Sequence, residues 1–177
     1  MIGLSISQHI MKYTIVRHEK LGEVFALYKN NKIYYVSFLE NLPSSLQSET
    51  NDVSLIFGIQ EPDFKINYKI NSYLLSKIDN PDTKHNFEIV FSGTEFQSRV
   101  WKEISNLKPH EIITYSELAN RIKSPSSVRA VASACAKNKI ALLIPCHQIV
   151  GMNANDYKYR WKPERKKYLL SNIINVL

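Results

Sequence analysis

The stretch Ile144-Pro145-Cys146-His147-Gln148-Ile149-Val150 places a cysteine and a histidine directly behind a proline, at the end of an apolar run that begins at Ile140. Proline fixes its own φ and disfavours helical backbone at the preceding residue, so rigid, extended chain should present the thiol. We therefore interpret Cys146 as a candidate nucleophile and His147 as its candidate base. A buried cysteine is more often a small hydrophobic residue, so this interpretation depends on the flanking sequence.

Further motifs flank this stretch on both sides. In chain order they are Gly93-Thr94-Glu95-Phe96-Gln97, Val100-Trp101, Thr114-Tyr115-Ser116-Glu117-Leu118-Ala119, Val128-Arg129-Ala130-Val131, Asn138, Tyr159-Arg160-Trp161 and Lys166. In this order and at these spacings the chain resembles the O6-alkylguanine-DNA alkyltransferases, also called methylated-DNA-protein-cysteine methyltransferases. The resemblance is specific from Gly93 to Leu170 and faint before Gly93.

The hydrophobic pattern divides the chain into two parts. Residues 13–16, 24–28 and 33–38 are rich in β-branched and aromatic side chains, and the pair at 30–31 is two asparagines, which favour a tight turn. These features predict a β-hairpin or meander. Residues 40–54 are polar and rich in serine, which predicts a loop; apolar side chains at helical spacing predict a helix over 66–78, and a short strand is expected at 87–91.

Capping signals predict the helices of the second part. Thr94 with Gln97, and Thr114 with Glu117, each form the pattern of a capping box. Ser124-Pro125 should cap and start a third helix over 126–137, and Pro163 should start the last one. The helices on either side of Ser124 would then form a helix-turn-helix.

We expect an α/β protein with two domains. Residues 1–90 form a small α/β support domain, and residues 91–177 form a mostly helical domain that carries the reactive site. The resemblance implies an RNase H-like fold for the first domain and a winged helix-turn-helix-like fold for the second.

The charge is distributed unevenly between the two parts. Residues 1–93 contain 9 Lys and Arg and 10 Asp and Glu, net −1, whereas residues 94–177 contain 14 and 6, net +8. A positive surface releases counterions when it neutralises phosphates, so the asymmetry is consistent with a polyanionic partner. A basic surface that serves only solubility would give the same count. The motifs favour double-stranded DNA.

Two cysteines without a CxxC spacing cannot form a disulfide framework or a four-thiolate zinc site, so no metal is expected. No apolar run is long enough to span a membrane, and the first residues lack the pattern of a secretory signal. We expect no membrane contact and an intracellular location, cytoplasmic or, in a eukaryote, nuclear. The resemblance implies a monomer that needs no cofactor.

The resemblance also implies roles for individual residues. In duplex DNA that contains O6-alkylguanine, and also O4-alkylthymine, the damaged nucleotide is flipped out of the helix, because the alkyl carbon cannot be reached while the base is stacked. Cys146 then takes the alkyl group irreversibly, and Tyr115 gives a proton to the leaving guanine. Arg129 takes the place of the flipped nucleotide while its helix lies in the minor groove. The remaining assignments are Ala130, Ser126, Thr94 and Gln97 for DNA binding, and Asn138, Tyr159, Arg160 and Lys166 for support of the site.

His147 raises a geometric question. Neighbouring side chains in an extended segment point to opposite sides, so a direct contact with Cys146 requires a turn, or else a water between them. The resemblance implies the water, together with a glutamate on the last helix that supports the histidine. An ungapped alignment places Ile173 where that glutamate would be, so the thiolate could be disfavoured by about ten- to a hundredfold. Gln148 and Lys162 also depart from the pattern; the first should weaken a supporting contact, and the second could change which alkyl groups fit.

Other classes of protein fit less well. An alkyltransferase-like protein would bind the lesion with weak or no transfer, and the missing glutamate leaves room for it, but such proteins replace the cysteine that this chain keeps. A helix-turn-helix transcription regulator would explain the basic half and leaves the Pro-Cys-His motif without a purpose. A thiol protease is not favoured, because no oxyanion-type turn signal precedes the cysteine. A metal site is not favoured, because the sequence offers too few ligands. Cys135, within the alanine-rich helix, is expected to be structural.

Overall fold

The computed structural model describes residues 10–40, 43–152 and 157–174. The chain begins with three antiparallel strands, β1 (Lys12–His18), β2 (Gly22–Lys29) and β3 (Lys32–Phe38). Two short strands extend the sheet in parallel, β4 (Asp63–Phe64) beside β1 and β5 (Glu88–Ile89) beside β3, in the order β4-β1-β2-β3-β5. Asn30 has a φ of 54° in the turn between β2 and β3, so the meander and its asparagine turn are confirmed.

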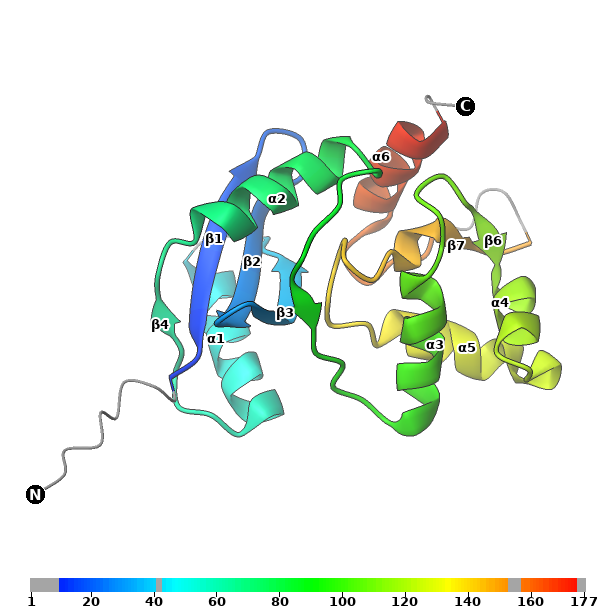
Figure 1. Ribbon diagram of the computed structural model, residues 1–177, viewed down its shortest axis with the longest axis horizontal. Helices are drawn as coiled ribbons and strands as arrows, with labels where there is room; N and C mark the ends of the chain where they lie inside the picture. Colours follow the sequence, from blue (N-terminus) through cyan, green and yellow to red (C-terminus); the bar gives the residue numbers. More distant parts are fainter. Residues whose placement is uncertain (1–9, 41–42, 153–156, 175–177) are drawn as a thin grey trace, which may run out of the picture.

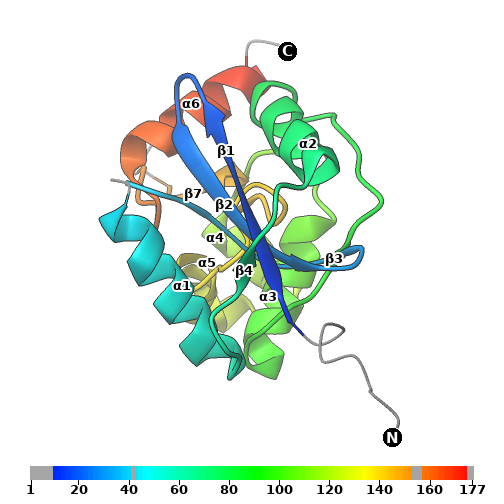
Figure 2. The same cartoon turned by 90° about the vertical axis from the view of Figure 1, so that its left-hand side faces the viewer.

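Both faces of the sheet are covered. Alternation along β2 sends Phe25 and Leu27 to one face, where they pack with Val53 of α1 (Ser44–Phe57). Val24 and Ala26 point to the other face, where α2 (Tyr68–Asp79) and the second half of the chain cover them. In Figure 1, α2 runs across the front of β1 and β2, and Figure 2 shows α1 and α2 on opposite sides of the strands. Every residue from Val24 to Tyr28 is therefore buried.

Helix α1 contradicts the prediction of a loop over residues 40–54. The segment is polar along most of its length, but Leu46, Thr50, Val53 and Phe57 recur at helical spacing on the face that meets the sheet. The helix ends at Gly58, which adopts the left-handed conformation with a φ of 59°. Burial of one narrow apolar stripe outweighed a composition that is typical of loops, because tertiary packing supplies most of the stability of such helices.

The second half of the chain is mostly helical, as expected. It contains α3 (Glu95–Ser105), β6 (Ile113–Thr114), α4 (Tyr115–Arg121), the 3-10 turn η2 (Pro125–Ser127), α5 (Val128–Ala136), the 3-10 turn η3 (Cys146–Gln148), β7 (Ile149–Val150) and α6 (Pro163–Ile174). Both predicted capping boxes are present, at Thr94 with Gln97 and at Thr114 with Glu117. Ser124 forms no side-chain cap, and the 3-10 turn separates it from the start of α5, so that helix begins later than predicted.

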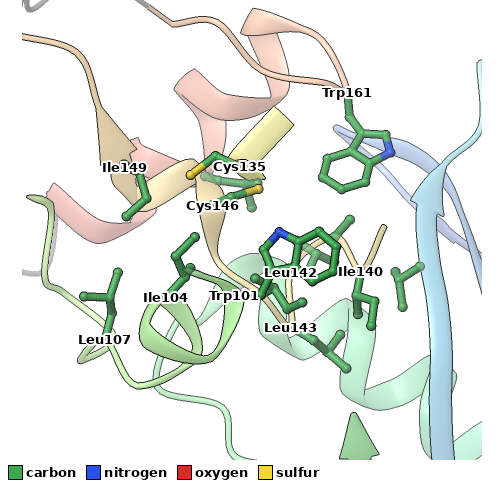
Figure 3. Packing of buried hydrophobic residues seen from close by; sticks show 14 of the residues in the cluster. Trp101, Ile104, Leu107, Cys135, Ile140, Leu142, Leu143, Cys146, Ile149 and Trp161 are labelled. Atoms are coloured by element: carbon green, nitrogen blue, oxygen red, sulfur yellow. The ribbon is translucent and has the colours of Figure 1, made fainter. Parts of the chain in front are cut away.

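One hydrophobic core joins the two halves. The cluster that contains Val24 and Val36 of the sheet also contains Trp101 of α3 and Trp161, whose packing appears in Figure 3. Backbone hydrogen bonds add to this contact, because Val36 N donates to Lys139 O at 3.0 Å and Ala141 N donates to Val36 O at 2.9 Å. The segment that leads to the Cys-His motif is thus attached to the central sheet.

No helix in the described ranges is long and apolar enough to cross a membrane.

Candidate active site

Cys146 and His147 lie in the 3-10 turn η3, and both side chains are buried. Pro145 suggested that the segment before them is extended, and this prediction is wrong. Ile144 N donates to Ile140 O at 3.1 Å, and Leu142 adopts a φ of 67°, so residues 140–144 form a compact turn. The turn does not bring Nδ1 of His147 into contact with the thiol: this nitrogen is buried and has no hydrogen-bond partner among the described residues.

Asn138 holds the cysteine in place. Its Nδ2 donates to Ile144 O at 3.0 Å and to Cys146 Sγ at 3.1 Å, while its Oδ1 accepts from Ile140 N at 2.9 Å. The side chain is fully buried, which strengthens each of these bonds. Asn138 does not adopt the left-handed conformation that we expected at the end of the helix; Lys137 caps α5 with a φ of −90°. The asparagine is thus positioned for side-chain bonding and not for turning the chain.

Cys146 faces a cavity of about 470 Å³. The cavity is lined by Tyr115, Ala132, Cys135, Ala136, Cys146, Lys158, Tyr159 and Arg160. Four separate regions of the sequence meet here: the start of α4, one face of α5, the turn η3, and the segment before α6. A cavity of this size falls in the range of small-molecule sites, about 300–1,000 Å³, so a single aromatic base can be accommodated beside the thiol.

Burial dominates the electrostatics of the cysteine. It raises the pKa of Cys146 to about 11, although the hydrogen bond from Asn138 and the positive charges of Lys166 and Arg160 act in the opposite direction. Lys166 is itself completely buried, and its Nζ donates to Ile149 O at 2.6 Å. At neutral pH the thiol is therefore protonated in the resting protein, and a cationic group is fixed near it.

His147 is a neutral imidazole. Burial and the positive charges of Lys166 and Lys77 lower its pKa to about 3. Its ring meets the edge of Tyr159, with centroids 6.4 Å apart. In the part of the chain that the structure describes, His147 forms no ion pair, and Ile173 is a buried hydrophobic residue. The histidine thus has no carboxylate that would make it a stronger base.

The residues assigned to DNA binding lie on the surface and outside the cavity lining. Arg129 and Ala130 are exposed near the start of α5, and Ser126 is exposed in η2. Thr94 and Gln97 bond to each other across the first turn of α3. Tyr115, by contrast, lines the cavity from the first turn of α4.

The segment before α6 supplies two supporting residues. Arg160 Nη1 donates to Asn138 O at 3.2 Å, and its guanidinium lies over the ring of Trp161. Tyr159 is packed between His147 and Trp161. Lys162 forms an ion pair with Glu40 of the first domain and is not among the residues that line the cavity.

Gln148 keeps a supporting role in η3. Its Nε2 donates to Lys108 O at 3.0 Å and to Glu111 O at 2.5 Å. These bonds attach the turn to the connection that follows α3. The expected loss of a contact at this position is therefore compensated in part by the amide.

Four residues of the cavity lining were not predicted as site residues: Ala132, Cys135, Ala136 and Lys158. The three on α5 are spaced i, i+3 and i+4, so helical periodicity places them on one face once one of them is known to face the cavity. Cys135 is thus part of the cavity lining and also a buried core residue, and Figure 3 shows it in the core beside Cys146. Lys158 carried no local signal.

The fold and the site define a protein of two packed domains whose reactive group is a buried cysteine at an open cavity. Among the described residues no group of three or more His, Cys, Asp or Glu side chains could hold a metal ion.

A family model described as the DNA-binding domain of 6-O-methylguanine DNA methyltransferase matches residues 95–172. The methylated-DNA-protein-cysteine methyltransferase of Saccharomyces cerevisiae is 32% identical over 165 residues, which cover 90% of this chain and 85% of that protein. Mycobacterium tuberculosis OGT, solved in complex with DNA, has a TM-score of 0.76 at 22% identity over 93% of both chains. The O6-methylguanine-DNA methyltransferase of Pyrococcus kodakaraensis has a TM-score of 0.68 at 22% identity and covers 93% of this chain and 99% of its own.

At 22% identity, the two solved structures show that this chain shares their fold. The Saccharomyces relative extends the likeness through both halves of the sequence. The chain belongs to the methylated-DNA-protein-cysteine methyltransferase family.

Proposed function

We propose that this protein repairs DNA directly, by transferring an alkyl group from O6 of alkylated guanine to Cys146. The single observation that carries the proposal is the position of Cys146, whose thiol faces a base-sized cavity opposite Tyr115. O4-alkylthymine is a second substrate of the same chemistry. Each molecule reacts once, because the thioether that forms on Cys146 is not hydrolysed in water at neutral pH.

DNA is the partner on which this reaction takes place. The half of the chain that contains the cavity has a net charge of +8, and one relative of the same fold was solved in complex with DNA. We assign α4, η2 and α5 as a helix-turn-helix whose second helix enters the minor groove. Arg129 is exposed near the start of that helix, where it can fill the space that a flipped nucleotide leaves. Flipping is required because the alkyl carbon of a stacked base is out of reach of a buried thiol.

The transfer is a displacement at carbon. Cys146 first loses its proton through water to the solvent, from which Tyr115 later regains one, and the thiolate attacks the alkyl carbon while the bond to O6 breaks. Tyr115 donates a proton to the departing guanine, so the base leaves as a neutral molecule. We assign Nδ1 of His147, which is buried and has no hydrogen-bond partner in the described part of the chain, to a water that bridges it to the thiol. Lys166 and the amide of Asn138 stabilise the thiolate as it forms.

Lesion binding without transfer is not favoured. The reason to consider it was the missing glutamate beside His147, and no acidic side chain among residues 10–40, 43–152 and 157–174 pairs with this histidine. Cys146 is nevertheless present at the cavity. Its sulfur accepts a hydrogen bond, and two cations oppose the increase in its pKa that burial causes. The Saccharomyces relative is itself named as a methyltransferase.

Intact-protein mass spectrometry tests the proposal. The protein is incubated with a duplex oligonucleotide that contains one O6-methylguanine, and the product is digested to locate the added mass. We expect one methyl group on Cys146, with full reaction in a Cys135→Ala variant and none in Cys146→Ala. An unchanged mass together with selective binding of the damaged duplex would overturn the assignment as a transferase.

A further inference from the structure

A second pocket lies on the first domain, away from the cavity beside Cys146. It has a volume of about 330 Å³ and is formed by the start of α2 and the residues that lead into β5. Its lining residues are Lys69, Tyr73, Lys84, His85, Asn86 and Phe87. Figure 1 and Figure 2 show α2 on the sheet, apart from α4 and α5. The proposed transfer reaction makes no use of this pocket.

Two ammonium groups belong to the pocket. Lys69 and Lys84 are both exposed, and Lys84 forms no hydrogen bond or ion pair with the part of the chain that the structure describes. Lys69 Nζ lies 5.3 Å from the centre of the Phe87 ring. No acidic side chain of the described chain belongs to the lining, and the flanking acids Asp82 and Glu88 each pair with another side chain. An anion in the pocket therefore meets a favourable potential.

Aromatic rings form much of the remaining wall. The ring of His85 lies 5.1 Å from that of Tyr73 and 6.1 Å from that of Phe87, measured between centroids. His85 is exposed, and a histidine ring of this kind can stack on a planar base. Its Nδ1 accepts a hydrogen bond from Phe87 N at 3.2 Å. In the neutral imidazole the proton is therefore on Nε2, which can donate to an anion.

The wall also contains an unsatisfied hydroxyl. Tyr73 is only 7% exposed, and its hydroxyl has no hydrogen-bond partner among the described residues. A buried hydroxyl without a partner costs free energy, and most buried polar groups in proteins are hydrogen-bonded. Because Tyr73 lines the pocket, a polar group of a ligand can supply the missing bond.

We propose that this pocket binds a nucleoside phosphate, whose phosphate is bound by Lys69 and Lys84 and whose base stacks on His85. The volume of about 330 Å³ lies at the lower end of the range for small-molecule sites and suits a single nucleotide. Lysine is a common phosphate ligand, and stacking on an aromatic ring tolerates any base. The nucleotide is either free or part of a single DNA strand. The inference goes beyond the proposed repair reaction and does not depend on it.

Nuclear magnetic resonance titrations of the full chain test the proposal. Deoxyadenosine monophosphate is the first probe, and the ring protons of His85 report its binding. Charge-assisted hydrogen bonds from two lysines are sufficient for a dissociation constant on the order of 1 mM or lower. Deoxyadenosine and inorganic phosphate should each bind at least about tenfold more weakly, because each lacks one half of the ligand. Equal affinity for the nucleotide and for phosphate, or no response of His85, would overturn the proposal.

Variants locate the bound nucleotide. Lys69→Gln and Lys84→Gln should each raise the dissociation constant by about tenfold, whereas Lys84→Arg keeps the charge and should retain binding. Lys65→Gln is the matched control, because Lys65 is exposed on the same domain and lies outside the lining. Tyr73→Phe should weaken binding without lowering the melting temperature of the free protein, since its hydroxyl has no partner there. Wild-type affinity in both glutamine variants of the lining lysines would place the nucleotide elsewhere and contradict the proposal.

A second ligand identifies the source of the nucleotide. The affinity for a single-stranded oligonucleotide with a 5′-phosphate is compared between Lys84→Gln and the control Lys65→Gln. Weaker binding by Lys84→Gln alone would assign the pocket to a nucleotide of a DNA strand. Equal binding of the strand, together with weaker binding of the mononucleotide by Lys84→Gln, would assign it to the free nucleotide.

Discussion

Cys146 combines a reactive position with a high pKa. Because burial raises the pKa to about 11, only about one thiol in ten thousand is ionised at pH 7. The thiolate is the attacking species, so its amount, and with it the rate, increases as the pH rises. A suicidal protein tolerates this slow step, since no turnover has to be sustained. Protonation of the resting thiol also protects it from unwanted reactions, because the thiol is a much weaker nucleophile than the thiolate.

The rate of transfer should therefore increase about tenfold per pH unit between pH 6.5 and 9.5. His147 has a pKa of about 3 and stays neutral over this range, so it should add no break near pH 6.5. The measurement is the single-turnover rate on an O6-methylguanine duplex at each pH, with circular dichroism to verify that the protein stays folded. A plateau that begins near pH 7 would show that the thiol is ionised more easily than its burial implies.

Replacement of Asn138 should affect both stability and reactivity. In Asn138→Ala, the amide of Ile140 and the carbonyl of Ile144 lose their buried partner, which should lower the free energy of unfolding by about 2–4 kcal/mol. The hydrogen bond to Cys146 Sγ is also lost, so the pKa of the thiol should rise and transfer should slow.

Urea unfolding and single-turnover kinetics measure these two effects. Asn120→Ala serves as a control, because Asn120 lies exposed on α4 and should change stability by about 0.5 kcal/mol or less. Wild-type transfer by a folded Asn138→Ala protein would mean that the asparagine contributes only to the fold.

At the level of elements, the connection between α4 and η2 contains a strained residue. Lys123 adopts a φ of 56°. Ser124 N donates to Ala119 O and Lys123 N donates to Asn120 O, both at 2.9 Å, which is the hydrogen-bond pattern of a Schellman motif. The left-handed position in this motif favours glycine, because a Cβ atom is crowded there.

Lys123→Gly should accordingly stabilise the protein by about 0.5–1 kcal/mol, even though glycine is more flexible in the unfolded chain. The melting temperature measures the effect. The comparison variant Lys123→Val should be destabilised, since a β-branched side chain tolerates this conformation least. A lower melting temperature for the glycine variant would show that the lysine side chain makes a stabilising contact that outweighs its strain.

At the level of the whole molecule, the two domains share one core. Residues of the sheet, α2 and α3 belong to a single hydrophobic cluster, and Arg165 of α6 connects the domains further. Its guanidinium donates to Leu21 O at 3.1 Å and to Leu39 O at 3.2 Å, and it lies over the ring of Phe38. Because the two halves share this core, we expect neither of them to fold independently of the other.

Unfolding should occur in one cooperative transition. Tryptophan fluorescence reports on the second domain, where Trp101 and Trp161 lie, and far-ultraviolet circular dichroism reports on both, so the two curves should coincide. Arg165→Ala should lower the free energy of unfolding by about 2–3 kcal/mol and move the common midpoint to a lower denaturant concentration, whereas Lys167→Ala, at an exposed position of the same helix, should change both little. Separate transitions would show that the shared core does not couple the domains.

Local features of this protein could be predicted where the signal is contained in a few neighbouring residues. The two capping boxes, the asparagine turn and the start of α6 at Pro163 are of this kind, because each depends on side chains that bond to backbone within one turn. Helix α1 was wrongly predicted as a loop, since its polar composition hides an apolar stripe that becomes decisive only against the sheet. The left-handed conformation of Lys123 likewise has no local signal.

The sequence by itself determined the capping boxes, the Pro-Cys-His motif and the uneven charge, all of which are properties of residue type and spacing. The tertiary structure alone decided what surrounds Cys146. Asn138, Tyr159 and Arg160 could be assigned to the site in advance. How close they lie to the thiol depends on how α4, α5 and the segment before α6 meet, and so does the position of Lys158 in the lining. The same packing excludes solvent from Cys146 and thereby raises the pKa of its thiol. Contacts between residues far apart in the chain have no local pattern, because the free energy of burial depends on which surfaces come together.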